Sequence, residues 1–399
     1  MSEDNPTLSL IHNTCLGLSL VAIGISLRLI LKHLRHFSQP IIQRKIISIL
    51  WMVPIYATTS WLSLRFVHFS IFLDILRDCY ESYVIYMFFA LCYCYIGQLS
   101  RTSIDRDRIH AVLAEKATVN HLINFPSCTG IAKGINLASD PRGFLLKCKQ
   151  YILQFVLIKP MSAIAIFVLT LYFDNYETGN FSPTNGYVYV TTIVNISISF
   201  SLYWLVMFYQ ATKDSLMPFT PVPKFLCIKG VLFFSYWQSV VITILVKVGI
   251  ITEIPIIHYS VEHVASTVQN SLICLEMVGF AIAHHYAFSA DPFYFLPTRL
   301  NSDLVISQPL VASHPREPTR TSARAMLLNA VDFSDVVSDL QEVAPDMPLV
   351  RYLRRNSSVI VEAGISTGSP PDSRLAIPSS TGINQLQETK QLPPRPSST

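Results

Sequence analysis

Charged side chains are scarce in this chain. Only 14% of its 399 residues are Asp, Glu, Lys or Arg, whereas 51% are hydrophobic and the mean hydropathy is +0.40. A typical soluble domain has about 25% charged residues. The composition therefore excludes an ordinary soluble protein and favours a chain that lies in a membrane.

Motifs of nucleotide and metal chemistry are missing as well. The sequence has no glycine-rich loop followed by Lys and Ser or Thr, and no His-Glu-x-x-His. Its scattered Cys and His residues complete no zinc-ligand set. The formal net charge of +4 is accounted for by basic loops beside an anionic leaflet. We expect no enzyme activity, no cofactor, no metal and no nucleic-acid partner.

Long apolar stretches are what the chain has instead. Each has about 20 residues or a little more, enough as a helix to cross about 30 Å of hydrocarbon. The stretches are 9–31, 46–67, 79–99, 150–173, 187–209, 229–251 and 263–287. We predict an all-α, polytopic seven-transmembrane helix bundle over 9–288, after a short outer tail over 1–8.

The distribution of Lys and Arg predicts the orientation of this bundle. Basic residues gather in the connections 32–45, 100–149 and 210–229, whereas 174–186 and 252–262 have none. Positive charge stays on the cytoplasmic side. The N-terminus is therefore expected outside or in a lumen, and the C-terminus in the cytoplasm.

Three residues are candidates for covalent modification. Asn180 begins the sequon Asn-Phe-Ser in an outer connection, where glycosylation operates. Cys148 and Cys227 lie near the inner interface, where cysteines are palmitoylated. For Cys92 and Cys94, on the same side, the alternative is packing as small apolar side chains.

The region 289–399 has a different composition. It is rich in Pro, Ser, Thr and Arg and has few large apolar residues, so we expect a mostly disordered cytoplasmic tail. Within it, acids alternate with apolar residues at helical spacing over 331–341. This pattern predicts a short acidic amphipathic helix, laid against the cytoplasmic face or held for a partner.

Polar residues at membrane depth are the candidate functional residues. Lys159, Asn195, Gln238 and Glu276 lie near the midpoints of four spans, and Glu81 lies nearer the outer face. Leaving an acid and a base unpaired in hydrocarbon costs about 5–7 kcal/mol, so we predict that Lys159 and Glu276 share one internal layer. That layer either fixes helix packing or lines a path for a solute. Pro160 favours the path, because proline inside a span frees a backbone carbonyl.

Ordered blocks of sequence resemble the organic solute transporter alpha and transmembrane protein 184 family. The match spans about 40–290. The blocks are Gln43-Arg44-Lys45 with 52–57 and 60–64, then 77–86, 144–150 with Lys159-Pro160, 225–229 with 233–238, and 269–277 with 283–288.

The resemblance implies a seven-span carrier that moves amphipathic organic solutes, such as sterol conjugates, without ATP. It also implies a single-span accessory subunit in one branch, the alternative being a homo-oligomer. Glu81, Lys159, Gln238 and Glu276 stand inside family-like blocks. Gly97-Gln98-Leu99 departs from the Gly-Gly-Glu expected there, and the closer likeness is to the transmembrane protein 184 side.

A seven-span receptor or a membrane-trafficking scaffold without flux is the alternative function. Against a receptor, span seven has no Asn-Pro-x-x-Tyr and span six has no Cys-Trp-x-Pro. Either protein would be integral and multi-pass, in the plasma membrane or in an endosomal or vacuolar one, with membrane lipids as its surroundings.

The predicted orientation is tested with epitope tags. A tag placed before residue 9 should bind antibody on intact cells or from the lumenal side of vesicles, and a tag after residue 399 should bind only after permeabilisation. The reverse pattern would contradict the orientation.

Overall fold

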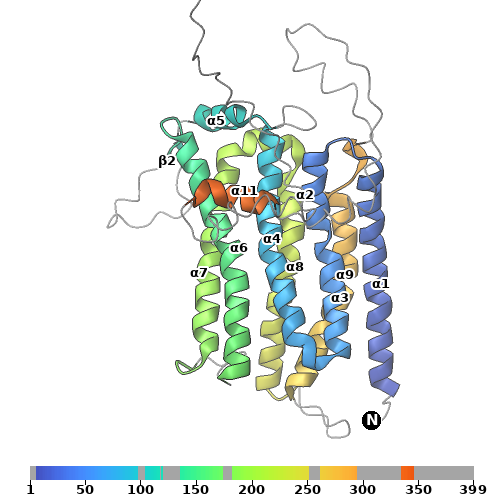
Figure 1. The fold of residues 1–399 in the computed structure, drawn as a ribbon. Helices are drawn as coiled ribbons and strands as arrows, with labels where there is room; N and C mark the ends of the chain where they lie inside the picture. The colour runs from blue at the N-terminus through green and yellow to red at the C-terminus, as the bar shows by residue number, and fades with distance from the viewer. Residues whose placement is uncertain are drawn as a thin grey trace, which may run out of the picture. The chain divides into compact units, whose positions relative to one another are not determined.

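The structure is a computed structural model, and it describes residues 6–97, 104–116, 118–119, 135–173, 182–250, 261–293 and 334–345. Asn180 and most of the predicted tail lie outside these residues. Figure 1 shows long helices running side by side, with the N-terminus at the end of the bundle opposite the short helix α5. We call these two ends the α5 end and the opposite end.

The described residues lie almost entirely in helices. The long ones are α1 (Pro6–Arg35), α2 (Pro40–Leu50), α3 (Met52–Arg65), α4 (Ser70–Gly97), α6 (Pro141–Tyr172), α7 (Gly186–Leu216), α8 (Pro221–Lys247) and α9 (Val261–Ala287). The short elements are η1 (Val67–Phe69), α5 (Arg106–Glu115), β1 (Thr118–Val119), β2 (Ile135–Asn136), η3 (Met217–Phe219), η5 (Asp291–Phe293) and α11 (Ser334–Val343). Among the described residues, seven segments are long and apolar enough to cross a membrane, and α2 with α3 forms one of them. The predicted fold class is confirmed, while the side that each end faces stays a prediction.

Several helices begin earlier than the apolar stretches predict. Proline stands at the start of α2, α6 and α8, where its missing N–H costs nothing and its fixed φ suits a first turn. The Asp140 carboxylate also caps α6 by accepting a hydrogen bond from the Gly143 N–H, at 2.7 Å. The first turns of α2 and α6, which we predicted as loop, are therefore helix.

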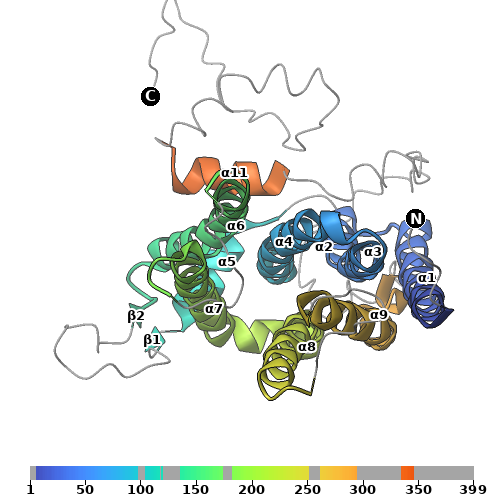
Figure 2. The ribbon, with the colours of Figure 1, turned by 90° about the horizontal axis from the view of Figure 1, so that it is seen from below.

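Packing divides the bundle into two groups joined by α4. On one side α9 packs on α1, α3 and α8, and on the other α6 packs on α7. Figure 2 shows α4 between these groups, where it contacts both α2 and α6. Large aromatic side chains of α4, among them Tyr83, Tyr86 and Phe89, are fully buried there. Since α4 is in contact with both groups, its polar side chains are placed to meet residues from either.

The α5 end is covered by short elements. The Asp105 carboxylate caps α5 by accepting hydrogen bonds from the backbone N–H groups of Asp107 and Arg108. Ile109 and Leu113 of α5 are fully buried, and β1 pairs antiparallel with β2 just beyond it. Lys116 ties this region to α7 by an ion pair with Asp214 at 2.9 Å.

Helix α11 lies where the sequence predicts an acidic amphipathic helix. It runs across the flank of α6 and α4, below α5 in the view of Figure 1. Its apolar residues Val336 and Leu340 are buried in the main hydrophobic core. The helix is therefore laid against the bundle, which is one of the two alternatives left open by its sequence.

Gly97 marks a close approach between α4 and the start of α5. A Cβ added there would lie 2.6 Å from Ile109 Cδ1 and 2.7 Å from Ile104 Cγ2, whereas one added at Gly17 of α1 meets nothing within 4 Å. We expect Gly97→Val to destabilise the protein by about 1–3 kcal/mol through overpacking. Thermal unfolding of the purified protein measures this, with Gly17→Val as the control, and equal melting temperatures for the two variants would contradict it.

Candidate functional site

A buried ion pair joins α4 and α6. The Lys159 ammonium donates a hydrogen bond to Asp78 Oδ2 at 3.0 Å and lies 4.0 Å from Glu81 Oε2. The side chains of Lys159 and Glu81 are 10% and 12% exposed, whereas that of Asp78 is 49% exposed. The lysine is thus held between one enclosed and one accessible carboxylate.

Further charges surround this pair. Arg77 donates a hydrogen bond to Asp74 at 2.8 Å, and its guanidinium lies 5.6 Å from the centre of the Tyr56 ring on α3. Lys229 of α8 interacts electrostatically with Glu81 and Lys159. We call these six ionisable side chains the charged cluster: Asp74, Arg77, Asp78, Glu81, Lys159 and Lys229. Three are acids and three are bases, so the formal charge of the cluster is zero.

Helical spacing explains why the acids of the cluster face one way. Asp74, Asp78 and Glu81 follow one another at four and then three residues, which places them along one stripe of α4. Apart from Ser70, Arg77, Ser82 and Gly97, the rest of that helix consists of apolar, aromatic and cysteine residues. The stripe therefore presents carboxylates to α6, and Lys159 is the base on α6 that meets it.

Proline follows the central lysine directly. Pro160 lies inside α6 and has no N–H to donate, so the carbonyl of Val156 loses its helical donor. The Ser162 hydroxyl donates to the carbonyl of Lys159 at 2.7 Å. The backbone of α6 is thus held by fewer main-chain hydrogen bonds at the depth of the cluster.

Gln238 and Glu276 form a second polar contact, between α8 and α9. The Gln238 amide donates to Glu276 Oε1. The other oxygens of the two side chains, Gln238 Oε1 and Glu276 Oε2, are buried and have no hydrogen-bond partner among the described residues. Unpaired buried acceptors are costly, so this pair is suited to receive a hydroxyl or amide donor from outside.

The predicted layer that joins Lys159 with Glu276 is wrong in its pairing. Lys159 binds carboxylates of α4, and Glu276 binds an amide of α8. The physical reason is the packing order: α6 lies on α4 and α7, whereas α9 lies on α1, α3 and α8. The sequence predicts a similar depth in the membrane for Lys159 and Glu276, but their helices α6 and α9 are not neighbours in the bundle.

The remaining predicted site residues lie apart from the cluster. Asn195 is exposed on α7, and its side-chain amide donates to the carbonyl of Thr191 in the same helix. Cys148 is fully buried in the hydrophobic core, where it packs as a small apolar residue and no acyl chain fits without opening the bundle. Cys227 is partly exposed, so palmitoylation stays a prediction for it.

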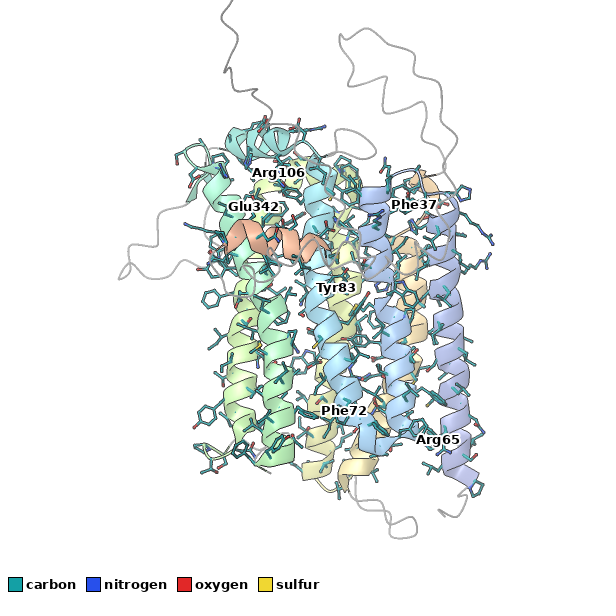
Figure 3. All side chains as sticks on the ribbon, viewed as in Figure 1. Phe37, Arg65, Phe72, Tyr83, Arg106 and Glu342 are labelled. Carbon is teal, nitrogen blue, oxygen red and sulfur yellow. The ribbon has the colours of Figure 1, made fainter. Side chains whose placement is uncertain are left out.

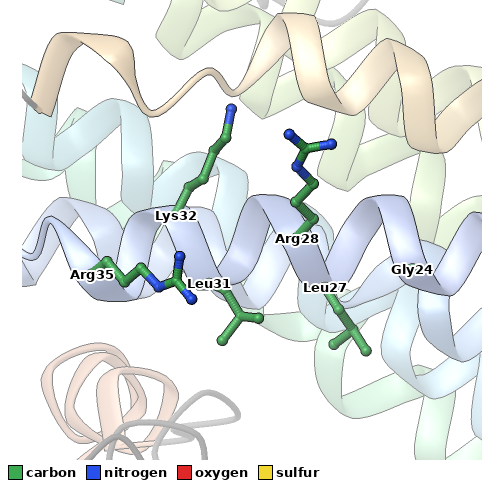
Figure 4. Close-up of a pocket in the computed structure, with 6 residues that line it drawn as sticks. All are labelled: Gly24, Leu27, Arg28, Leu31, Lys32 and Arg35. Atoms are coloured by element: carbon green, nitrogen blue, oxygen red, sulfur yellow. The ribbon is translucent and has the colours of Figure 1, made fainter.

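A separate hollow of about 360 Å³ runs along the α5 end of α1. It is lined by Gly24, Leu27, Arg28, Leu31, Lys32 and Arg35. Figure 4 shows the basic side chains extending from the helix beside two leucines. Basic ends above apolar stems are typical of side chains that reach for a membrane interface, so this hollow belongs to the lipid-facing surface.

Comparison with known families assigns the bundle. Residues 11–293 match the family described as organic solute transporter Ostalpha. The chain belongs to the organic solute transporter alpha family. The match contains the charged cluster and the Gln238–Glu276 pair, so both lie within the family domain. This member of the family is an integral, multi-pass membrane protein with a solute-transporter domain. No solved structure matches the chain significantly.

Sequence reasoning missed several members of the cluster in this transporter-family protein. The sequence assigns four of them to predicted connections, because they border apolar stretches. These four are Asp74, Arg77, Asp78 and Lys229. Their spacing was the available signal, since carboxylates three and four residues apart predict one polar face of a helix.

We expect Lys159→Met to deprive Glu81 of the base that lies 4.0 Å away and to destabilise the protein by about 2–3 kcal/mol. The loss should be smaller than that of a fully buried pair, because Asp78 stays accessible. Lys247→Met is the matched control, since Lys247 is exposed at the end of α8. Adding Glu81→Gln to Lys159→Met should recover part of the loss. Chemical unfolding of the purified variants measures this, and strictly additive effects would contradict the pairing.

Proposed function

We propose that this chain carries amphipathic organic solutes, sterol-like or lipid-like, across its membrane by facilitated transport without ATP. The charged cluster is the observation that carries the proposal. Ionisable groups at membrane depth are costly to desolvate, and those that persist there commonly line solute and ion pathways. The family match supports a solute as the cargo.

The exposure of Asp78 suggests how a solute would enter the cluster. Its carboxylate binds Lys159 yet remains 49% exposed, so a solute can reach this ion pair through Asp78. The anionic end of an amphipath could take its place on Lys159 without leaving that base unpaired. Glu276 Oε2 and Gln238 Oε1, both unpartnered, would accept hydroxyl groups along the same path.

The sequence supports the proposal that transport needs no ATP. A phosphate-binding glycine loop is missing, so a solute gradient is the proposed driving force. We also propose that the chain is no enzyme. A Gly-x-Ser-x-Gly string does occur at 364–368, but Ser369, Pro370 and Pro371 follow it, where a nucleophile elbow requires a helix.

The partners and the location are part of the proposal. A single-span accessory subunit or a second copy of the chain would complete the carrier, in the plasma membrane or in an endosomal or vacuolar one. The exposed apolar residues of α7 and α8, such as Ile193, Phe233 and Ile244, give such a partner or the lipid a surface to cover.

Flux through the purified chain tests this function. We expect proteoliposomes that contain only this protein to take up a labelled sterol sulfate. Lys159→Met and Glu276→Gln should each lower uptake by about tenfold, the effect of losing one interaction of about 1.4 kcal/mol. Lys247→Met is the control at matched protein content.

Two outcomes would contradict the proposal. Unchanged flux in both variants would leave the cluster a packing device. Absence of flux together with ligand-dependent recruitment of a G protein or a trafficking factor would favour the receptor or scaffold instead. Flux restored only by a co-purified single-span protein would assign the accessory subunit.

A further inference from the structure

Two lysines are buried beneath α11, on the flank of the bundle. Lys45 of α2 and Lys149 of α6 have side chains only 8% and 4% exposed. Lys45 lies five residues and Lys149 eight residues after the start of its helix, about 8 Å and 12 Å along the axis. Both are therefore enclosed at the depth where lipid headgroups meet hydrocarbon.

Helix α11 supplies the carboxylates that these lysines bind. Lys45 lies 2.5 Å from Asp335, and Lys149 lies 2.9 Å from Asp339 and 2.8 Å from Glu342. Among the described residues, every ion pair of the two lysines is with α11. Neither base has a carboxylate partner within the transmembrane helices there.

Aromatic side chains of α4 lie beside the two lysines. The Tyr86 hydroxyl donates a hydrogen bond to Asp339 Oδ2 at 2.9 Å, and the Lys149 ammonium lies 5.2 Å from the centre of the Tyr93 ring. Beside them, Val336 and Leu340 of α11 enter the hydrophobic core. The seat thus binds an anion and an apolar group together, and we call Lys45, Lys149, Tyr86 and Tyr93 the lysine seat.

A further base reaches the end of α11 from α5. Arg106 lies 3.9 Å from Glu342, and Figure 3 shows the two labelled residues facing each other across the gap between α5 and α11. Burial works against ionisation of Glu342, but the hydrogen bond and charge of Lys149, with the charges of Arg106 and Arg142, hold the pKa of its carboxyl below the ordinary value. The carboxylate form is therefore the one that is bound.

The position of the seat decides which anion could replace α11. Figure 2 shows α11 on the outer side of α6 and α4, away from the middle of the bundle. A ligand on this flank arrives from the bilayer rather than from the solute path. Because the seat combines two bases with an apolar wall, a phospholipid with an anionic headgroup matches it in charge, depth and shape of contact.

We propose that the lysine seat binds the anionic headgroup of a bilayer phospholipid, and that α11 competes with this lipid for it. In a neutral membrane, α11 occupies the seat through its three carboxylates. Where the leaflet is anionic, lipid phosphate and carboxylate replace them and α11 is released. This switch depends on lipid composition. It is a separate proposal from transport, and a failure of either one leaves the other in place.

Spin-label distance measurement on the full chain in nanodiscs tests the release. One label is placed at Ser338→Cys on the exposed side of α11, and the other at Gln150→Cys, exposed on α6. We expect a short, narrow distance in phosphatidylcholine and a growing long-distance fraction as phosphatidylserine is added. Lys45→Met with Lys149→Met should abolish the lipid dependence. Removing two bases near an anionic leaflet should lower the affinity for the anionic lipid by about tenfold or more.

The control separates the seat from general repulsion between an acidic helix and an anionic leaflet. Arg44→Met with Lys147→Met removes two exposed bases next to the seat lysines and should keep the lipid dependence. Loss of the dependence in this control, or its survival in the seat variant, would overturn the proposal.

Lipid retention measured by native mass spectrometry tests the competition directly. Asp335→Asn, Asp339→Asn and Glu342→Gln together leave the bundle untouched and should raise retention of phosphatidylserine over phosphatidylcholine. Unchanged retention would refute the competition. Glycerophosphoserine, which has the headgroup without acyl chains, should not release α11, and equal release by it would refute a bilayer lipid as the ligand.

Discussion

The charged side chains enclosed in this bundle need polar partners, and for Lys45, Lys149 and Lys159 those partners are carboxylates. This requirement organises the structure. An isolated charge in hydrocarbon costs about 2.5–3.5 kcal/mol on insertion scales, a large part of the total stability of a protein. Helix α4 meets the requirement twice. Its carboxylates hold Lys159 of α6 at one depth, and its tyrosines help to seat α11 over Lys149 at another. The central position of α4 follows from its contacts with Lys159 and α11 as much as from its buried aromatic residues.

The sequence predicts the number and order of the spans well, because each needs about 20 apolar residues and such runs are unmistakable. Helix starts are predicted poorly. A hydropathy window excludes polar first turns, so Lys45 and Lys149 read as loop charges, although Pro40 and Pro141 already begin their helices. Proline at a first helical position was the usable signal.

Pairing between helices is the part that sequence could not predict. Depth follows from residue number, and it correctly placed Lys159 and Glu276 inside the membrane domain. Which residues become partners depends on which helices pack together. That packing is decided by side chains far apart in the sequence. Asp78 is the partner of Lys159 because α4 lies against α6, and Gln238 is the partner of Glu276 because α8 lies against α9. A single charge at a given depth carries no information on this choice.

Helix α6 carries two of the three lysines that bind carboxylates in the charged cluster and the lysine seat. Lys149 and Lys159 are ten residues apart on α6, about 15 Å along its axis, and each is held by groups that α4 presents or by the helix laid across α4. A rotation of α6 against α4 would therefore disturb both sets of ion pairs at once. The hydrogen bond that Pro160 removes is the one to the Val156 carbonyl, between Lys149 and Lys159, so a bend there would move Lys159 while Lys149 keeps its partners. Such a bend would let the charged cluster rearrange while α11 stays bound, as the proposed carrier with its proposed lipid-responsive helix requires.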